Sequence, residues 1–222
     1  MEKILEQLIT HQTLDREALV RLMADPSPAL GAHLADAARK VCEEHYGTAV
    51  FTRGLIEFTN CCRNDCLYCG IRRSNRKLHR YRLDKEQILA CTDQGYALGF
   101  RTFVLQGGED PWFTVDRLEA VVAAVHARFP DCAITLSVGE RPREDYERFY
   151  AAGADRFLLR HETADDAHYR TLHPREMDPE HRKACLYALQ AIGYQVGTGF
   201  MVGSPGQTVE HLVSDLLFIQ AL

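Results

Sequence analysis

The stretch that decides the fold is GLIEFTNCCRNDCLYCG, residues 54–70. Its apolar run, residues 55–58, has the length and composition of a buried strand. Four cysteines follow within nine positions, namely Cys61, Cys62, Cys66 and Cys69. We therefore expect a loop at the carboxyl end of a strand in which three thiols, counted from Cys62, are spaced C-x3-C-x2-C.

This cysteine spacing points to a metal cluster held by one loop. Three thiolates can hold three corners of a cubane 4Fe-4S cluster, which usually takes four cysteines, so one iron would stay open to a small chelating molecule. The competing interpretation is a closed zinc site with Cys61 as its fourth sulfur. Zinc loops normally bring a second ligand pair from a distant segment, and no later C-x2-C or C-x2-H pair follows. Counting C-x4-C from Cys61 is a further possibility, although C-x3-C-x2-C from Cys62 is the better fit.

Residues 51–222 alternate between strand-like and helix-like segments. The strand-like runs are residues 55–58, 102–105, 133–136, 156–159 and 196–202. Such alternation predicts an α/β fold with a parallel sheet and helical crossovers, either a TIM-type (β/α) barrel or a doubly wound sheet. Residues 1–50 have the apolar spacing of helices and form a helical segment ahead of it. The chain ends within an apparent fifth crossover helix, so we expect a truncated barrel of about five β/α units.

The loops after the strands are where chemistry is expected, because ligands of parallel α/β folds bind at the carboxyl ends of the strands. The second run leads into Gly107-Gly108-Glu109, and glycines there allow a ligand to approach the backbone closely. The fourth run ends in Arg160-His161-Glu162-Thr163, where a core strand emerges into three ionisable groups. His161 and His168 lack the spacing of a zinc-protease pair, so we expect packed or surface histidines.

Composition excludes several classes of protein. The chain has 46% hydrophobic and 26% charged residues, which fits a globular protein and not a disordered one. Its net charge of −5 gives no reason to expect nucleic acid as a partner. No run of 18 apolar residues occurs and the first residues carry acids, so we expect no membrane and a cytoplasmic protein.

Taken together, the cysteine spacing after the first strand and the GGE tripeptide after the second resemble the radical S-adenosylmethionine (SAM) superfamily. The resemblance implies that Cys62, Cys66 and Cys69 ligate a 4Fe-4S cluster whose free iron binds SAM. One electron from the cluster would then cleave SAM to methionine and a 5′-deoxyadenosyl radical. The GGE element would receive the amino group of SAM.

Within this superfamily the chain resembles the HydE-type maturases of FeFe-hydrogenase. The similar strings are CRNDCLYCGIRRSN, RYRL, LQGGEDPWF, TLSVGERPREDYERFYAAGADRFLLRHET and GFMVGSPGQT. The resemblance implies a set of SAM-binding residues, namely Tyr68, Gly107, Gly108, Glu109, Glu162, Arg182, Met201 and Gly203. It also implies that Thr135 and Arg160 hold an anionic substrate, and that the substrate is an iron complex carrying cysteine, CO and cyanide.

Partners and alternatives follow from the same residues. A basic stretch beside the cysteine loop, with Arg72, Arg73, Arg76, Lys77, Arg80 and Arg82, is usually a solvated surface, but it could dock an acidic electron donor such as a flavodoxin or ferredoxin. Other hydrogenase maturases are possible partners. Methylornithine synthase and biotin synthase are the nearest enzyme alternatives. From other classes, a zinc-stabilised binding module and an inactive fragment stay open.

Overall fold

The computed structural model describes residues 1–222 and divides into two compact units. The larger comprises Thr52–Phe200 together with the terminal Leu222, and the smaller comprises Met1–Phe51 together with Met201–Ala221.

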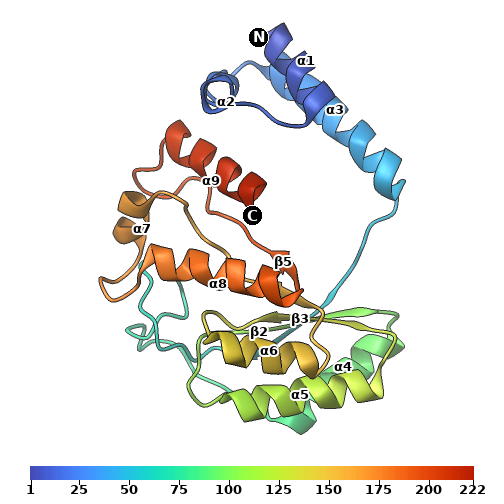
Figure 1. The fold of residues 1–222 in the computed structure, drawn as a ribbon. Helices are drawn as coiled ribbons and strands as arrows, with labels where there is room; N and C mark the ends of the chain where they lie inside the picture. Colours follow the sequence, from blue (N-terminus) through green and yellow to red (C-terminus); the bar gives the residue numbers. More distant parts are fainter. The chain divides into compact units, whose positions relative to one another are not determined.

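The larger unit is built on a five-stranded parallel sheet whose strands follow one another in chain order (Figure 1). The strands are β1 (Gly54–Thr59), β2 (Thr102–Gly107), β3 (Ala133–Ser137), β4 (Arg156–Leu158) and β5 (Gln195–Gly197). A doubly wound sheet would reverse its strand order at a switch point, and none is present. The sequential order is that of a barrel segment, which confirms the expected α/β, TIM-type fold.

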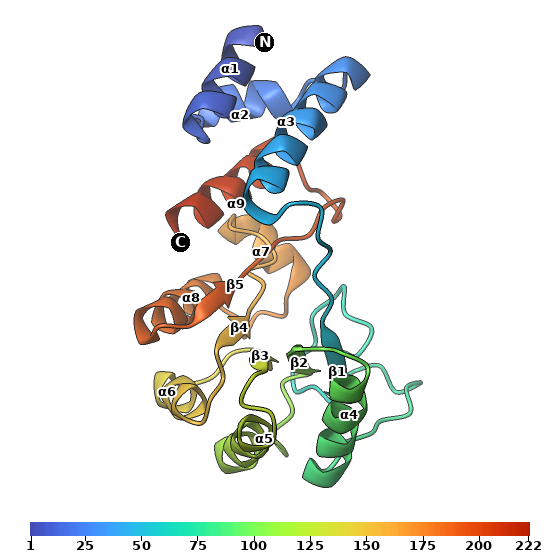
Figure 2. The ribbon, with the colours of Figure 1, turned by 90° about the vertical axis from the view of Figure 1, so that its right-hand side faces the viewer.

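Helices follow each strand and cover one face of this sheet, as Figure 2 shows for α4, α5, α6 and α8. The helices of this unit are α4 (Lys85–Ala97), α5 (Val115–Arg128), α6 (Arg143–Ala151), α7 (Asp166–Leu172) and α8 (Pro179–Ile192). Alternate strand residues such as Phe103, Ile134 and Phe157 are fully buried. Removing this apolar surface from water drives the helices onto the sheet.

Helix ends agree with the local sequence. The side chain of Asp84 accepts a hydrogen bond from the backbone nitrogen of Gln87, and the Gln87 side chain accepts one from the backbone nitrogen of Asp84, which forms a capping box. Gly99, Gly153 and Gly193 follow helices with φ of 95°, 110° and 111°, the left-handed conformation that glycine adopts at low cost.

Two elements differ from expectation. The fifth strand is Gln195–Gly197 and does not continue to residue 202, because its partner β4 already ends at Leu158. Beyond it the two segments are joined by an isolated bridge between Glu162 and Phe200 and by single hydrogen bonds, such as that from the backbone nitrogen of Glu162 to the carbonyl of Gly199. The short helix α7 has no strong apolar period in the sequence and was not expected. It begins where the side chain of Asp165 caps the backbone nitrogen of His168.

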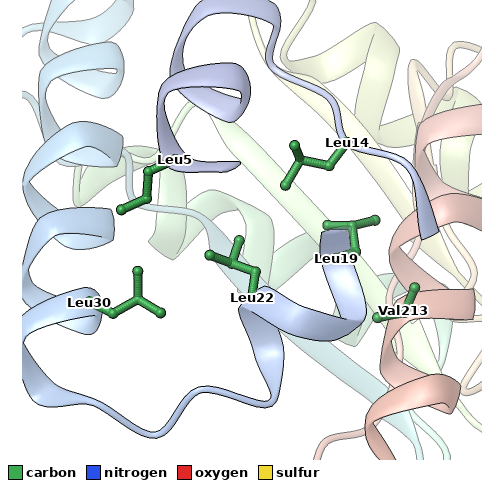
Figure 3. Close-up of a cluster of buried hydrophobic side chains, with 6 residues drawn as sticks. All are labelled: Leu5, Leu14, Leu19, Leu22, Leu30 and Val213. Atoms are coloured by element: carbon green, nitrogen blue, oxygen red, sulfur yellow. The ribbon is translucent and has the colours of Figure 1, made fainter. Parts of the chain in front are cut away.

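The smaller unit is a helical cluster with its own apolar core. Its helices are α1 (Glu2–His11), α2 (Arg16–Met23), α3 (Pro28–Tyr46) and α9 (Val209–Ala221). The side chains that meet at its centre are Leu5, Leu14, Leu19, Leu22, Leu30 and Val213, and Figure 3 shows them. The expected boundary near residue 50 coincides with the start of the larger unit. Residues 201–221, which we had assigned to the barrel, group here with the N-terminal helices.

None of the helices combines the length and the apolar composition that crossing a lipid bilayer requires.

Candidate functional site

The cysteine loop follows β1 directly and is fixed by backbone hydrogen bonds to two other loops. The backbone nitrogen of Arg63 donates to the carbonyl of Glu109, at 2.9 Å, after β2. That of Leu67 donates to the carbonyl of Leu172, also at 2.9 Å, at the end of α7. The loop therefore has a defined conformation that does not depend on its own short-range contacts alone.

Three of the four clustered cysteines interact electrostatically with one another. Cys66 interacts electrostatically with both Cys62 and Cys69, and burial raises the pKa of Cys66 to about 12. Burial also raises the pKa of Cys62. The thiol of Cys61 instead lies 3.8 Å from the carbonyl oxygen of Tyr81. Cys61 is thus distinguished from the other three by this contact, and the choice of Cys62, Cys66 and Cys69 as the C-x3-C-x2-C ligands stays a prediction.

The loop after β2 packs tightly against the cysteine loop. A Cβ atom at Gly108 would lie 2.3 Å from the carbonyl oxygen of Cys61 and 2.8 Å from the Cβ of Cys62. Glu109 is buried, and its carboxylate accepts hydrogen bonds from the Arg63 side chain and from the backbone nitrogen of Glu140, both at 3.1 Å. Any side chain at position 108 would thus collide with the cysteine loop. Through its carboxylate, Glu109 connects the loop after β2 to Arg63 in the cysteine loop and to Glu140 after β3.

We expect Gly108→Ala to disturb the cysteine loop, because the new methyl group would overlap the Cys61 carbonyl. Gly70→Ala is the matched control, since a Cβ at Gly70 has no atom within 4 Å. Overpacking of this kind costs about 1–3 kcal/mol. Chemical denaturation should show that loss for Gly108→Ala and a change within about 0.5 kcal/mol for Gly70→Ala. Equal stability of the two variants would contradict the close approach.

Arg182 is a buried arginine that is bonded to polar groups after β3 and β4. Arg182, on α8, donates from Nε to the carboxylate of Glu140 and from Nη1 to the carbonyl of Arg160, at 3.0 Å. Burial alone would lower the pKa of this guanidinium, but the charge of Glu140 outweighs it, so the pKa is raised. Arg182 is a permanent cation held in a fixed orientation, suited to binding a carboxylate.

Glu162 combines an unusual backbone conformation with a buried carboxylate. Its φ of 68° is one of two positive values among the non-glycine residues, and its side chain is only 10% exposed. Burial raises the pKa of its carboxyl group, although Arg160 and Arg182 oppose this. Its Oε2 atom is buried and has no hydrogen-bond partner, with the Arg160 guanidinium 3.5 Å away. Strained backbone and an unsatisfied buried oxygen are typical of ligand sites.

A group of aromatic residues, which we did not predict from the sequence, positions Tyr68. The Tyr68 hydroxyl lies 3.0 Å from Nε2 of His173, whose Nδ1 is 2.9 Å from the carbonyl of Tyr169. The rings of His173 and Tyr169 stack with centroids 3.7 Å apart. The hydroxyl of Tyr169 is a further buried polar atom with no hydrogen-bond partner. No sequence motif marks this pairing, because α7 itself was not expected.

His173 makes stability depend on pH. Burial lowers its pKa from 6.5 to about 4, so the folded protein keeps it neutral while the unfolded chain binds a proton below pH 6.5. The free energy of unfolding is therefore unaffected by His173 above pH 6.5, where the ring is neutral in both states, and it decreases as the pH falls toward 4. Between pH 7 and 5 we expect wild type to lose about 2 kcal/mol more than His173→Gln, measured by urea denaturation. Parallel pH profiles would contradict this.

The remaining expected residues are dispersed. Thr135 is buried within β3 opposite Val104 and Arg156, deeper in the sheet than Arg160, which follows β4. Met201 and Gly203 belong to the smaller unit, where the Gln207 side chain bonds to the backbone of both. Their contact with SAM, like the substrate contact of Thr135, stays a prediction. His161 and His168 are both buried, as expected of packed histidines.

Comparison with known proteins adds the decisive observation. The model of the Radical SAM superfamily matches residues 56–219, which include the cysteine loop, the GGE element and Arg182. The chain belongs to the radical SAM superfamily. That superfamily uses a 4Fe-4S cluster and SAM, which confirms the expected cofactors.

Individual radical SAM proteins resemble the chain over nearly all its length. It is 42% identical to the [FeFe] hydrogenase maturase subunit HydE of Thermotoga maritima, over 98% of this chain and 62% of the relative. It is 29% identical to a 3-methylornithine synthase of Methanosarcina barkeri, over 93% and 58%. A crystal structure of methylornithine synthase, PylB, superposes with a TM-score of 0.90 at 26% identity, covering 98% of this chain and 64% of that one. The chain thus spans about three fifths of these curated relatives.

The residues present fit the cluster that radical SAM proteins use. Cys62, Cys66 and Cys69 are free and half-buried, and they interact with one another. No three side chains of His, Cys, Asp or Glu are placed to hold a single metal ion. Three thiolates from one loop are the ligands that three corners of a 4Fe-4S cluster require. The Oε2 atom of Glu162, which has no hydrogen-bond partner, belongs to a carboxylate that interacts electrostatically with the cation of Arg182. Both residues suit a charged cofactor.

Proposed function

We propose that Cys62, Cys66 and Cys69 hold a 4Fe-4S cluster and that the polar residues around them bind SAM. The observation that carries this proposal is the electrostatic interaction of Cys66 with two further thiols and with the buried cation of Arg182, beside a buried carboxylate whose Oε2 has no hydrogen-bond partner. These groups come from two different loops and from α8. Reductive cleavage of SAM is the chemistry that the bound cluster supplies in this superfamily.

In this proposal, different residues bind different parts of SAM. Arg182 offers a fixed cation for the SAM carboxylate, and Glu162 offers an acceptor for a hydroxyl or ammonium group. Tyr68, held by His173, presents an aromatic ring 39% exposed that suits stacking on adenine. The backbone at Gly107, Gly108 and Glu109 would receive the amino group.

We further propose that the whole protein acts as a HydE-type maturase of FeFe-hydrogenase. Identity of 42% over nearly the whole chain supports this role over methylornithine synthase, at 29%. Arg160 follows β4 with 48% of its side chain exposed, and it would bind an anionic substrate together with Thr135 of the neighbouring β3. The substrate in this proposal is an iron complex. Formation of 3-methylornithine by the whole protein would favour the alternative.

The test of cofactor binding is spectroscopic. After anaerobic reconstitution with iron and sulfide, the reduced chain should give the electron paramagnetic resonance (EPR) spectrum of a 4Fe-4S cluster. Adding SAM should shift this spectrum, because SAM would bind the iron that has no cysteine. A chain that takes up zinc alone, or a spectrum insensitive to SAM, would overturn the proposal.

The electron donor and the cellular location complete the proposal. Arg73, Arg76 and Lys77 are exposed beside the cysteine loop, as is Leu67 within it. A basic surface with an apolar centre suits an acidic flavodoxin or ferredoxin. All eight cysteines are free, which agrees with a reducing cytoplasm.

A further inference from the structure

Arg80 does not behave as the solvated cation that the basic stretch suggests. Its guanidinium donates hydrogen bonds to four backbone carbonyl oxygens. Nη1 donates to the carbonyls of Asn60 and Ile71, the latter at 2.7 Å. Nη2 donates to those of Arg72, at 2.7 Å, and Asn75, at 3.2 Å.

These four acceptors lie on both sides of the cysteines. Asn60 comes two residues before Cys62, whereas Ile71 and Arg72 come two and three residues after Cys69. One planar side chain therefore joins the two ends of the loop that carries Cys62, Cys66 and Cys69. A guanidinium can do this because it presents five donors in a rigid fork, while a lysine has three donors on one flexible atom.

The segment that carries Arg80 is itself anchored independently of the cysteines. The side chain of Asn60 donates to the carbonyl of His79 and accepts from the backbone nitrogen of Tyr81, both at 2.8 Å. Two residues after Arg80, Arg82 makes two hydrogen bonds, of 2.6 and 3.0 Å, to the fully buried carboxylate of Asp110. Burial opposes ionisation of Asp110, but the bonds from Arg82 and from the backbone of Trp112 outweigh it and lower its pKa. The backbone around Arg80 is thus held in place by hydrogen bonds other than those of Arg80 itself.

We propose that Arg80 is a positioning residue for the cluster, which holds the two ends of the cysteine loop so that its thiols converge before iron binds. The inference rests on the proposed role of Cys62, Cys66 and Cys69 as ligands. Three thiolates brought together repel one another, and a loop closed in advance lowers the cost of assembling them. Nothing in this role requires Arg80 to contact the cluster or SAM.

The test compares Arg80→Gln and Arg80→Lys with Lys85→Gln, which removes an exposed cation paired only with exposed Glu86. The first measurement is the half-life of the reconstituted cluster against an iron chelator. We expect Arg80→Gln to shorten it roughly 10- to 100-fold, as for residues that orient metal ligands. Arg80→Lys should recover part of this loss, and Lys85→Gln should match wild type.

Two further measurements separate positioning from general stability. In the metal-free chain, amide hydrogen exchange of residues 61–75 should be faster in Arg80→Gln, while exchange in β2 and β3 is unchanged. The EPR spectrum of its reduced cluster should be broadened, since the ligand loop would be heterogeneous. An Arg80→Gln chain with wild-type half-life and wild-type exchange would overturn the proposal.

The remaining outcomes are also decisive. If Arg80→Gln does not fold, Arg80→Lys decides, and a wild-type half-life there overturns the proposal because lysine cannot span four carbonyls. Cys62→Ser in the same assay tests the cluster ligands separately. Loss of iron in Cys62→Ser with none in Arg80→Gln removes only the role of Arg80. Full iron in Cys62→Ser removes the proposed function itself.

Discussion

Cys62→Ser is expected to lose the cluster, whereas Cys61→Ser is expected to keep it. The two residues are neighbours in the chain, but Cys62 interacts electrostatically with Cys66 and Cys69, while the thiol of Cys61 lies 3.8 Å from the carbonyl oxygen of Tyr81. Serine is a poor substitute for a thiolate in an iron-sulfur cluster. Reductive cleavage of SAM by Cys62→Ser should fall by more than roughly 100-fold, beyond the effect of losing an orienting residue.

The measurement is iron and sulfide per chain after anaerobic reconstitution, followed by the rate of SAM cleavage with a chemical reductant. Circular dichroism of both variants establishes that the fold is intact. Cys61→Ser is the control because it differs by one position and makes the same chemical change. If Cys61→Ser lost iron and Cys62→Ser retained it, the C-x4-C arrangement would be the correct one.

The second large effect is expected at Arg182. Arg182→Met would leave the carboxylate of Glu140, only 12% exposed, without its buried partner. Breaking a buried ion pair on one side costs about 3–5 kcal/mol. SAM binding should weaken as well, by about 2–5 kcal/mol, because the cation proposed to meet its carboxylate is gone.

A double-mutant cycle separates these two consequences. Adding Glu140→Gln to Arg182→Met removes the unpaired charge, so much of the stability should return, as thermal unfolding would show. SAM affinity, measured by calorimetry on the reconstituted chain, should not return with it. Recovery of both would mean that Arg182 acts only through the structure, and recovery of neither would mean that Glu140 is not the group left uncompensated.

The sequence predicted the elements that depend on neighbours along the chain. The capping box at Asp84 and the glycines after α4, α6 and α8 show why, since a helix end is determined by a few adjacent residues. The four strands β1 to β4 were placed within two residues at each end. The length of β5 was overestimated, because a strand ends where its partner ends, and that partner is 37 or more residues away in the chain.

Local order along the chain by itself determined the superfamily, the parallel α/β architecture and the three candidate cluster ligands, because all of these depend on spacing within one loop or on strand and helix period. Tertiary structure decided which cysteine stands apart, why Gly108 must be glycine, and what Arg80, Glu140, Tyr169 and His173 contribute. Those roles depend on contacts between segments far apart in sequence, such as the 42 residues between Arg182 and Glu140. A cation in a basic stretch looks the same in sequence whether it is solvated or bonded to four carbonyls, and only the folded chain supplies the acceptors.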